Sequence, residues 1–440
     1  MPDEAHFPTS ARHSVLPEEA QPPSPLLQDD DPFSSMMERF DQAAARLGLD
    51  PDRYSVLRVP DREFKFSVPV VLPDGNIKVY HGYRIMHNLS LGPCLGGFRL
   101  EAEVNRSELR ALAGWNTWKC AALDVPFGGS MGAVNFDPRG KAPALIETVV
   151  RRYTAGLLDL IGPERDVIIP DLHADEQIMA WMLDTYSQHV RHTENAVVVG
   201  KPLGLGGTRG RDIAVGLGAR VILEKHLAEM GHVGPARVAI VGCGQIGAQV
   251  ATELHRRGHR IIAMSDLRGA VRNGEGLDVP AVLEHRSALG SVAGFSRAEQ
   301  LERDEVLELD CDVLIPAATS RLITGLNAEK IRARMILETA NAPTSARADQ
   351  ILSERGIPVV PDLLGNSGSV IIAYFEWVQN RMGYAWPIEL VTERLERQVL
   401  EAYDRACAMA AKHKIGLRLA TCMEGVQRVA YFDEIRGIYA

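Results

Sequence analysis

Two glycine-rich segments of the chain could bring the backbone close to a small molecule, and a lysine lies between them. The first runs from Gly92 to Gly97 and the second from Pro126 to Gly132, and the stretch between them has the pattern of a helix that ends near Lys119. Glycine permits positive φ and close approach of backbone to a ligand, both of which a Cβ would hinder. The pattern predicts two turns around a small-molecule pocket, although ordinary hairpin or helix-entry turns fit it equally well.

A second glycine cluster has the spacing of a dinucleotide-binding loop. Gly242, Gly244 and Gly247 directly follow a predicted apolar strand and precede a predicted helix that ends at His255. Asp266 ends the next predicted strand, 19 residues beyond the last of these glycines. This complete βαβ context makes the G-x-G-x-x-G pattern far more specific than the glycines alone.

The loop predicts how a dinucleotide would be held. The pyrophosphate would lie at the amino end of the helix, and Asp266 would accept a hydrogen bond from a ribose hydroxyl. Arg268 is close enough in sequence to hold a 2′-phosphate, so the choice between NAD and NADP stays open. The predicted cofactor-binding residues of this loop are Gly242, Gly244, Gln245, Ile246, Gly247 and Asp266.

The composition is typical of a soluble globular protein with two or three domains. The chain has 440 residues, of which 46% are hydrophobic and 24% are charged. Its net charge of −9 argues against nucleic-acid binding and against attraction to an anionic membrane surface. The sequence has no apolar run of about 18 or more residues, and its first residues lack the layout of a secretory signal. We therefore expect a cytoplasmic protein without a nucleic-acid or membrane partner.

Six cysteines are scattered along the chain without C-x-x-C spacing. Free, buried thiols in a reducing cytoplasm explain this distribution better than metal ligation does. No metal site is predicted.

Four regions are expected along the chain, which we assign to the α/β class. Residues 1–33 are rich in proline and acidic residues and are predicted to be a disordered tail. Residues 34–195 are predicted to form a first α/β domain, residues 196–365 a doubly wound parallel sheet that binds the dinucleotide, and residues 366–440 a set of helices. A glycine-rich crossing at 197–207 could act as a hinge between the two domains. The expected helices span 34–47, 144–158, 175–189 and 211–230, and the expected strands span 63–71, 77–86, 166–170, 237–242, 260–265, 313–316, 335–338 and 358–361.

Several longer phrases carry a resemblance to a known family. They are the 83–134 stretch with its two glycine segments, GRDIAVGLG, CDVLIPAA, ETANAPT and YFEWVQN. The chain resembles the amino-acid dehydrogenases that act on glutamate, leucine, phenylalanine and valine, and its likeness is closest to glutamate dehydrogenase. The resemblance implies hydride transfer between the α-carbon of an amino acid and a nicotinamide, with NAD or NADP as cofactor. It also implies a hexamer, and C-terminal helices that return to the substrate-binding and oligomerisation domain to close a cleft.

Two residues match functional positions of that family. Asp171 matches the catalytic aspartate, and its alternative role is to cap the predicted helix 175–189. Lys119 matches the lysine that binds the substrate's α-carboxylate, and its alternative is an ordinary lysine that faces solvent at a helix end. Gly96 belongs to the same predicted substrate site.

Met131 stands where the family has its general acid/base lysine. A thioether cannot carry or shuttle a proton. The nearest lysines, Lys119 and Lys141, are 12 and 10 residues away, so a slip of one residue does not restore the amine. Loss of general acid/base help alone costs roughly 10²–10⁴ in rate. We therefore expect the usual catalysis to be impaired.

Leu95 and Ala373 indicate a changed substrate pocket. In glutamate-specific members, a lysine and a serine at these positions hold the distal carboxylate of glutamate. Against Leu95 and Ala373 that charge would stay unpaired, at a cost of several kcal/mol. An aliphatic side chain would gain roughly 1.5–3 kcal/mol from burial there. The pocket is predicted to prefer an apolar amino acid such as leucine, unless the two residues simply pack around an empty, closed site.

The cofactor contacts are also altered. Val215 replaces a threonine that contacts the cofactor in this family, and Gln245 replaces an asparagine of the glycine loop. Valine has the shape of threonine without its hydroxyl, so one hydrogen bond to the nicotinamide amide is lost. Asn341, in the phrase ETANAPT, is retained as a predicted cofactor contact. NAD or NADP binding is expected to be weakened or lost.

Three hypotheses follow from these residues. The first is a non-catalytic member of the family that binds a leucine-like amino acid and regulates an active glutamate dehydrogenase within a homo- or hetero-hexamer. The second is an active amino-acid dehydrogenase in which another group or water moves the proton. The third is a dinucleotide or metabolite sensor.

Overall fold

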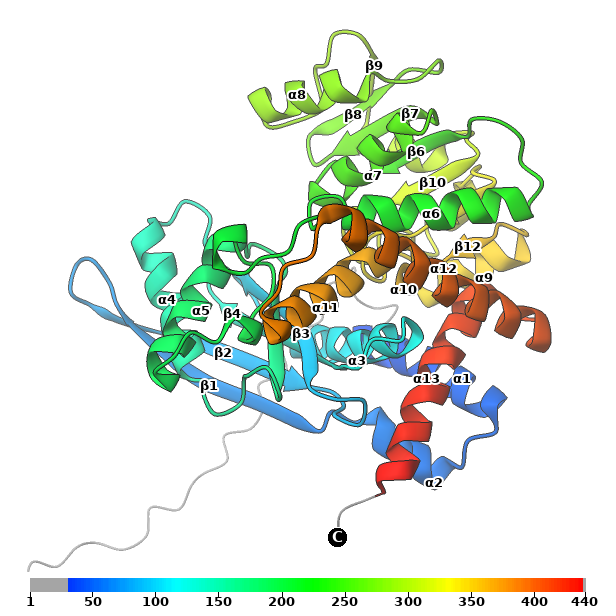
Figure 1. The fold of residues 1–440 in the computed structure, drawn as a ribbon. Helices are drawn as coiled ribbons and strands as arrows, with labels where there is room; N and C mark the ends of the chain where they lie inside the picture. Colours follow the sequence, from blue (N-terminus) through cyan, green and yellow to red (C-terminus); the bar gives the residue numbers. More distant parts are fainter. Residues whose placement is uncertain (1–30, 438–440) are drawn as a thin grey trace, which may run out of the picture.

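The computed structural model describes residues 31–437, which form two lobes, each built on one β-sheet (Figure 1). The chain crosses from the first sheet to the second near residue 200 and returns to the first lobe through its last helices. No helix in the described part of the chain is both long and apolar enough to cross a membrane. The two-lobed α/β class predicted from the sequence is confirmed.

The first sheet has five strands in the order β1-β2-β4-β3-β5. β2 runs antiparallel to both of its neighbours, β1 and β4, whereas β3 runs parallel to both β4 and β5. The predicted strands 63–71, 77–86 and 166–170 are all present, to within one residue at their ends. The observed strands are β1 (Arg62–Val71), β2 (Ile77–Met86), β3 (Cys94–Glu101), β4 (Gly128–Asn135) and β5 (Asp166–Pro170).

The prediction that the two glycine-rich segments form turns is wrong. Both segments lead into adjacent parallel strands, and Gly96 of β3 lies opposite Ser130 of β4. A Cβ on Gly96 would overlap the Ser130 carbonyl oxygen, and one on Gly128 would overlap the carbonyl oxygen of Asn88. The glycines therefore serve close packing of backbone in the sheet. Both strands are buried along nearly their whole length, so neither has the alternation that identifies a half-exposed strand.

Different helices cover the two faces of the first sheet. α4 (Pro143–Ala155) and α5 (Glu176–Val190) share one apolar core with Phe98 of β3. α3 (Arg106–Ala122) packs on the other face, in a core that includes Met131 of β4. Met131 of β4 therefore lies in the layer between the first sheet and α3.

The second sheet has seven strands in the order β12-β11-β10-β6-β7-β8-β9. The five strands from β12 to β7 are parallel, as predicted, but β8 and β9 add an antiparallel edge that the sequence did not indicate. These two strands are too short, at four and three residues, to show a recognisable pattern. The strands are β6 (Arg237–Val241), β7 (Arg260–Asp266), β8 (Gly269–Arg272), β9 (Glu299–Leu301), β10 (Val313–Pro316), β11 (Met335–Leu337) and β12 (Val359–Val360).

Four longer helices accompany the second sheet. α6 packs against α7, and α7 in turn contacts α8 and strands β6 and β7. The predicted helix 211–230 corresponds to α6, which begins three residues later. The helices are α6 (Ala214–Glu229), α7 (Gln245–Arg256), α8 (Val279–Leu289) and α9 (Ala346–Glu354).

The first helix starts inside the region predicted to be a tail. α1 (Pro32–Leu47) begins at a proline, and the Asp31 carboxylate accepts a hydrogen bond from the Ser34 amide at 2.9 Å. Proline and an aspartate cap are both favoured at a helix start. Residues 32 and 33 are therefore helical, Asp31 caps the helix, and residues 1–30 of the predicted tail lie outside the described residues.

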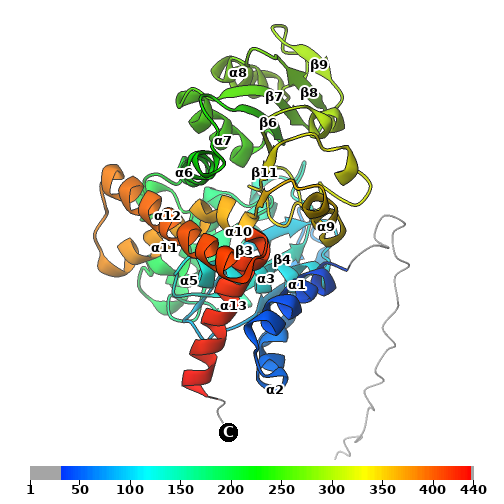
Figure 2. The same cartoon turned by 90° about the vertical axis from the view of Figure 1, so that its right-hand side faces the viewer.

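The C-terminal helices return to the first lobe. The predicted breaks at Gly383 and Pro387 separate α11 (Ser367–Met382) from α12 (Ile388–His413), and α13 (Leu417–Arg436) follows. α13 packs against α1 and α3, so that the first and last helices of the described chain lie side by side (Figures 1 and 2). This return is the arrangement that the family resemblance implied.

The packing of Gly96 gives a stability prediction. Gly96→Ala should destabilise the chain by about 3 kcal/mol or more, because a Cβ there overlaps the Ser130 backbone and overpacking of that kind strains a rigid core. Denaturant unfolding would measure the loss. Gly204→Ala is the matched control, since a Cβ at Gly204 meets no atom within 4 Å. Equal stability of the two variants would contradict the role assigned to Gly96.

Candidate functional site

Met131 and Asp171 face each other across Gly97. Gly97 lies beside Met131 in the β3–β4 register, and Asp171 directly follows β5, which pairs with the other edge of β3. A Cβ added to Gly97 would lie 2.8 Å from Met131 Sδ and 2.9 Å from Asp171 Oδ2, so both atoms flank the same point. Met131 is buried, with 1% of its surface exposed. An amine in place of this side chain would lie beside the Asp171 carboxylate.

Arg99 is the cation that contacts Asp171. Its Nη2 donates to Asp171 Oδ2 at 3.0 Å, and its Nη1 lies 2.8 Å from Glu101 and 3.1 Å from Glu108. Sequence analysis did not identify this contact. The signal was present, because side chains two residues apart on a strand share a face, which places Arg99 on the side of Gly97.

The structure excludes both alternative roles considered for the retained residues. Asp171 does not cap the next helix, because Asp175 occupies the cap position of α5 and accepts from the Ile178 amide at 2.9 Å. Lys119 does not face solvent, because only 2% of it is exposed. Asp171 instead accepts from Arg99, and Lys119 reaches the second lobe.

Lys119 makes a direct contact between the lobes. It lies in the last turn of α3, and its Nζ donates to Asn341 Oδ1 at 2.9 Å. Asn341 follows β11 of the second sheet and also accepts from Asn366 Nδ2 at 3.3 Å. Burial lowers the pKa of Lys119, and the nearby carboxylates of Asp362 and Asp171 oppose that shift. The lobes are thus closed on each other at the predicted carboxylate-binding lysine.

Leu95 and Ala373 belong to one apolar cluster, although they are far apart in sequence. Leu95 is 1% exposed on β3, and Ala373 is fully buried on α11. The same cluster contains Cys120 beside Lys119, and Phe127 before β4. This cluster is large and extends through both lobes, and both positions that were predicted to select the substrate side chain are buried within it.

The dinucleotide loop has the geometry that pyrophosphate binding requires. Gly242 has a φ of 107°, and a Cβ on Gly247 would overlap the Gly242 carbonyl oxygen. At Gly244, which precedes α7, a Cβ would meet no atom within 4 Å, and no side chain caps the helix. The amides of Gln245 and Ile246 are thus at an open helix end, where an anion is favoured. The site fits a dinucleotide.

Asp266 already has several protein donors. Its Oδ1 accepts from the Arg268 amide at 2.8 Å and from Ser291 Oγ at 2.9 Å, and its Oδ2 accepts from the Val292 amide at 2.6 Å. A carboxylate offers about four lone-pair positions, so only about one remains for a ribose hydroxyl. The Arg268 guanidinium donates to the Leu289 carbonyl at 3.4 Å, near where a 2′-phosphate was predicted.

Val215 lies at the start of α6 and is 6% exposed. A Cβ on Gly368 of α11 would come within 3.0 Å of its Cα, so Val215 packs beside the helix that carries Ala373. The valine thus lies at the joint between the second lobe and the C-terminal helices.

His87 and Thr117 fix α3 to the sheet next to this site. His87 Nδ1 lies 3.0 Å from Thr117 Oγ1, which accepts from the Gly129 amide at 2.9 Å. The His87 amide in turn donates to the Gly129 carbonyl at 2.8 Å. Burial lowers the pKa of His87 to about 4, so the imidazole is neutral at pH 7.

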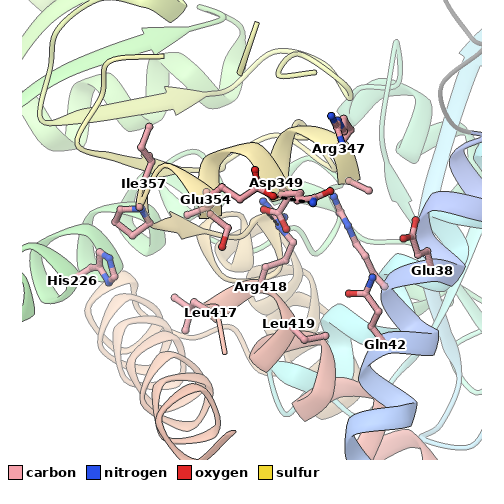
Figure 3. A pocket seen from close by; sticks show the side chains of 18 of the residues that line it. Glu38, Gln42, His226, Arg347, Asp349, Glu354, Ile357, Leu417, Arg418 and Leu419 are labelled. Atoms are coloured by element: carbon pink, nitrogen blue, oxygen red, sulfur yellow. Dashed lines mark hydrogen bonds and ion pairs between the residues drawn. The ribbon is translucent and has the colours of Figure 1, made fainter. Parts of the chain in front are cut away.

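A separate open cavity of about 1090 Å³ lies between α1, α9 and the start of α13 (Figure 3). One ion pair joins two of its lining residues, since Arg418 donates to Asp349 at 2.8 Å, and Arg418 also donates to Glu338, which lies outside the lining, at 2.7 Å. These bonds join α13 to the second lobe. The cavity contains none of the predicted site residues, and we assign it a structural role.

Among the residues that the structure describes, no group of three or more His, Cys, Asp or Glu side chains could hold a metal ion. The six cysteines are unpaired, and five of them are buried, as expected. Burial raises the pKa of Cys120, beside Lys119, to about 12. Thiolate chemistry in the cleft is therefore disfavoured.

Two sequence profiles together match most of the chain. Residues 60–188 match the family described as "Glu/Leu/Phe/Val dehydrogenase, dimerisation domain", and residues 206–437 match "Glutamate/Leucine/Phenylalanine/Valine dehydrogenase". The chain is 38% identical to a glutamate dehydrogenase of Thermotoga maritima, over 92% of this chain and 98% of the relative. It is also 38% identical to the catabolic NAD-specific glutamate dehydrogenase RocG of Bacillus subtilis, over 92% of this chain and 96% of that protein.

Solved structures give the same result. The chain is similar to the hetero-hexameric glutamate dehydrogenase from Thermus thermophilus in its Leu-bound form, with a TM-score of 0.90 and 38% identity. That match covers 96% of this chain and all of the other. A glutamate dehydrogenase from Peptoniphilus asaccharolyticus matches with a TM-score of 0.81 and 32% identity, over 93% of this chain and all of the other.

The neutral His87 gives a pH prediction. Its folded-state pKa of about 4 lies below the unfolded value of about 6.5, so the unfolded chain binds this proton more readily. The stability that His87 contributes is complete above pH 6.5 and falls by up to about 3 kcal/mol as the pH drops to 4. Denaturant unfolding at pH 7 and pH 4.5 should show a smaller acid loss for His87→Gln than for the unaltered chain. Replacement of the exposed His192 is the control and should change nothing.

Proposed function

Because the chain belongs to the glutamate/leucine/phenylalanine/valine dehydrogenase family, we propose that it is a non-catalytic member that regulates an active glutamate dehydrogenase. In this proposal the chain binds an apolar amino acid and co-assembles with the active subunit. The observation that carries the proposal is Met131, which faces Asp171 where an amine would be needed.

Proton transfer is the step that this cleft lacks. A general acid/base must gain and lose a proton near neutral pH, which a thioether cannot do. The cation that does contact Asp171 is Arg99, and a guanidinium stays protonated in proteins. Neither neighbour of Asp171 can therefore take the role of a lysine with a lowered pKa.

The amino-acid preference rests on the cluster that holds Leu95 and Ala373. The distal carboxylate of glutamate would enter this cluster without a partner at either position, at a cost of several kcal/mol. A leucine side chain would instead exchange water for apolar contacts. The Leu-bound state of the Thermus thermophilus hetero-hexamer supports this choice of ligand.

Co-assembly is supported by the same structural relative, which is hetero-hexameric. A subunit without its own chemistry can act only through contacts with other subunits, so a mixed hexamer is the simplest assembly for this chain. NAD or NADP would bind at Gly242, Gly244 and Gly247, more weakly than in active relatives because Val215 lacks a hydroxyl.

The second candidate is an active amino-acid dehydrogenase, and one observation favours it. Burial lowers the pKa of Lys119, which brings the amine that the cleft retains closer to the range in which it could exchange protons. In this case Lys119 would have to release Asn341 and act beside Asp171. A metabolite sensor is the third candidate, and it needs only the dinucleotide loop.

The isolated chain should not oxidise amino acids. We expect no turnover of glutamate or leucine with NAD or NADP, because Met131 offers no titratable group. Absorbance of the reduced cofactor would measure it. Turnover at an ordinary enzyme rate of about 1 s⁻¹ or more would contradict the regulatory proposal and favour the active dehydrogenase.

Met131→Lys should restore slow oxidation of apolar amino acids. Lysine and methionine are both long and unbranched, so the new side chain fits beside Gly97 and brings an amine to Asp171. We expect a rate at least about 10²-fold above that of the unaltered chain. Met131→Leu is the control, since it keeps the apolar volume and adds no amine. A folded Met131→Lys chain that remains inactive would show that more than the proton-transfer group has been lost.

A further inference from the structure

The turn that follows β11 contains a residue in an unfavourable backbone conformation. Ala342 has a φ of 45°, in the left-handed region that residues with a Cβ rarely adopt. Asn341, the residue before it, accepts from Lys119 Nζ at 2.9 Å. A strained residue persists only where the surrounding structure holds it in place. The groups that hold Ala342 are therefore of interest for the contact between Asn341 and Lys119.

Asp362 holds this turn on its amide side. Its Oδ2 accepts from the Ala342 amide at 2.9 Å. That amide belongs to the peptide bond between Asn341 and Ala342, and a peptide bond is planar. Fixing the plane therefore limits both the ψ of Asn341 and the φ of Ala342. On the carbonyl side of the turn, the Arg321 amide donates to the Ala342 carbonyl at 3.0 Å, so both peptide bonds that flank Ala342 are held.

The same Asp362 oxygen also contacts the first lobe. Trp115 Nε1 of α3 donates to Asp362 Oδ2 at 2.6 Å. Trp115 and Lys119 are four residues apart on α3, the spacing at which helical side chains share a face. One face of α3 therefore makes two contacts across the lobes, at Asp362 and at Asn341. These two partners are joined to each other through the Ala342 amide.

Asp362 is itself firmly placed. It is fully buried at the start of α10 (Asp362–Gly365), just after β12 of the second sheet, and its amide donates to Glu338 Oε2 at 3.0 Å. The Asp362 carbonyl accepts from the Asn366 amide at 3.0 Å, and Asn366 Nδ2 donates to Asn341 Oδ1 at 3.3 Å. The backbone and the side chain of Asn341 are thus both linked to Asp362 and the residue that ends α10.

Asp362 acts on Lys119 by charge as well. Burial lowers the pKa of Lys119, and the Asp362 carboxylate is the strongest of the nearby charges that oppose this shift. The carboxylate therefore favours the protonated amine that donates to Asn341. Any test of a positioning role must separate it from this effect of charge.

We propose that Asp362 is a positioning residue, which holds the turn at Ala342 and so directs the Asn341 side chain towards Lys119. Asn341 is the predicted cofactor contact and Lys119 the predicted carboxylate-binding lysine, so this support acts on both predicted binding sites. The inference goes beyond the proposed function, and it stands whether or not Met131 prevents turnover.

Chemical labelling of Lys119 tests the proposal. The lysine is 2% exposed, so an amine-acylating reagent should modify it slowly, and loss of the Asn341 contact should speed the reaction. Asp362→Ala and Asp362→Asn both remove the charge, but only asparagine keeps an oxygen that can accept from the Ala342 amide. We expect Lys119 to be labelled at least about 10-fold faster in Asp362→Ala than in Asp362→Asn. Mass spectrometry of the peptide that contains Lys119 measures the rate in each folded variant.

Glycine at position 342 distinguishes positioning from a general loss of stability. Glycine adopts positive φ without strain, so the turn should no longer need Asp362. Ala342→Gly added to Asp362→Ala should bring the labelling rate back to within about threefold of the Asp362→Asn rate. Ala340→Gly is the matched control, because Ala340 lies on the other side of Asn341 and its φ is outside the left-handed region. This control should give no rescue.

Ala342→Val tests the same turn without altering Asp362 or its buried partners. A β-branched side chain is poorly tolerated at positive φ. Labelling of Lys119 should therefore rise at least about 10-fold over the unaltered chain. Ala346→Val is the control, since Ala346 is half-buried like Ala342 but lies in the first turn of α9, and it should leave the rate unchanged.

Three results would overturn the positioning role of Asp362. They are equal labelling of Asp362→Ala and Asp362→Asn, which would leave only the effect of charge, failure of Ala342→Gly to restore the rate, and equal labelling of Ala342→Val and Ala346→Val. If Asp362→Ala does not fold, the comparison of the two valine variants decides. None of these measurements uses turnover or a bound ligand, so the proposed function stands or fails separately.

Discussion

The buried ion pair between Arg84 and Asp166 is the interaction on which the site depends. The two side chains are fully buried and share two hydrogen bonds of 2.6 Å. The guanidinium also donates to the Gly97 carbonyl at 2.8 Å and to Ser130 Oγ at 2.7 Å, so one side chain of β2 joins β3, β4 and β5. Removing one partner of such a pair leaves a buried charge, which costs about 3–5 kcal/mol. Met131 and the other site residues of these strands are positioned by this network.

This arrangement explains how the site could lose a proton-transfer group and keep its shape. The positions of β3 and β4 are set by Arg84, Asp166 and glycine packing, none of which involves the side chain at position 131. Methionine at that position joins the apolar core beneath α3 and leaves no charge to be solvated. The backbone positions that shape an amino-acid site therefore do not depend on the residue that transfers protons. This independence is the physical basis for a family member that binds an amino acid without reacting with it.

Much of the frame could be predicted from sequence, because it depends on local patterns. The strand β1 alternates clearly, the loop at Gly242 has a complete βαβ context, and Asp171 and Lys119 stand in recognisable phrases. The glycines of β3 and β4 led to a wrong prediction of turns, because glycine is common both in turns and where two backbone segments pack closely. Only the position of the neighbouring strand in the structure distinguishes the two cases. Strand alternation could have placed Arg99 on the face of Gly97, but its contact with Asp171 joins residues far apart in sequence, and no local pattern identifies that partner.

Closure of the lobes is the property that a non-catalytic subunit could still transmit. Lys119 joins the lobes at Asn341, and Arg418 joins α13 to Glu338 of the second lobe. At the crossing that was predicted to be a hinge, Lys201 forms a buried ion pair of 2.7 Å with Glu376 of α11, which ties this crossing to the C-terminal helices. Because α13 packs against α1 and α3 of the first lobe, a change in lobe position must alter those helices too. Closure driven by an amino acid would thus reach the surface of the first lobe without any chemical step.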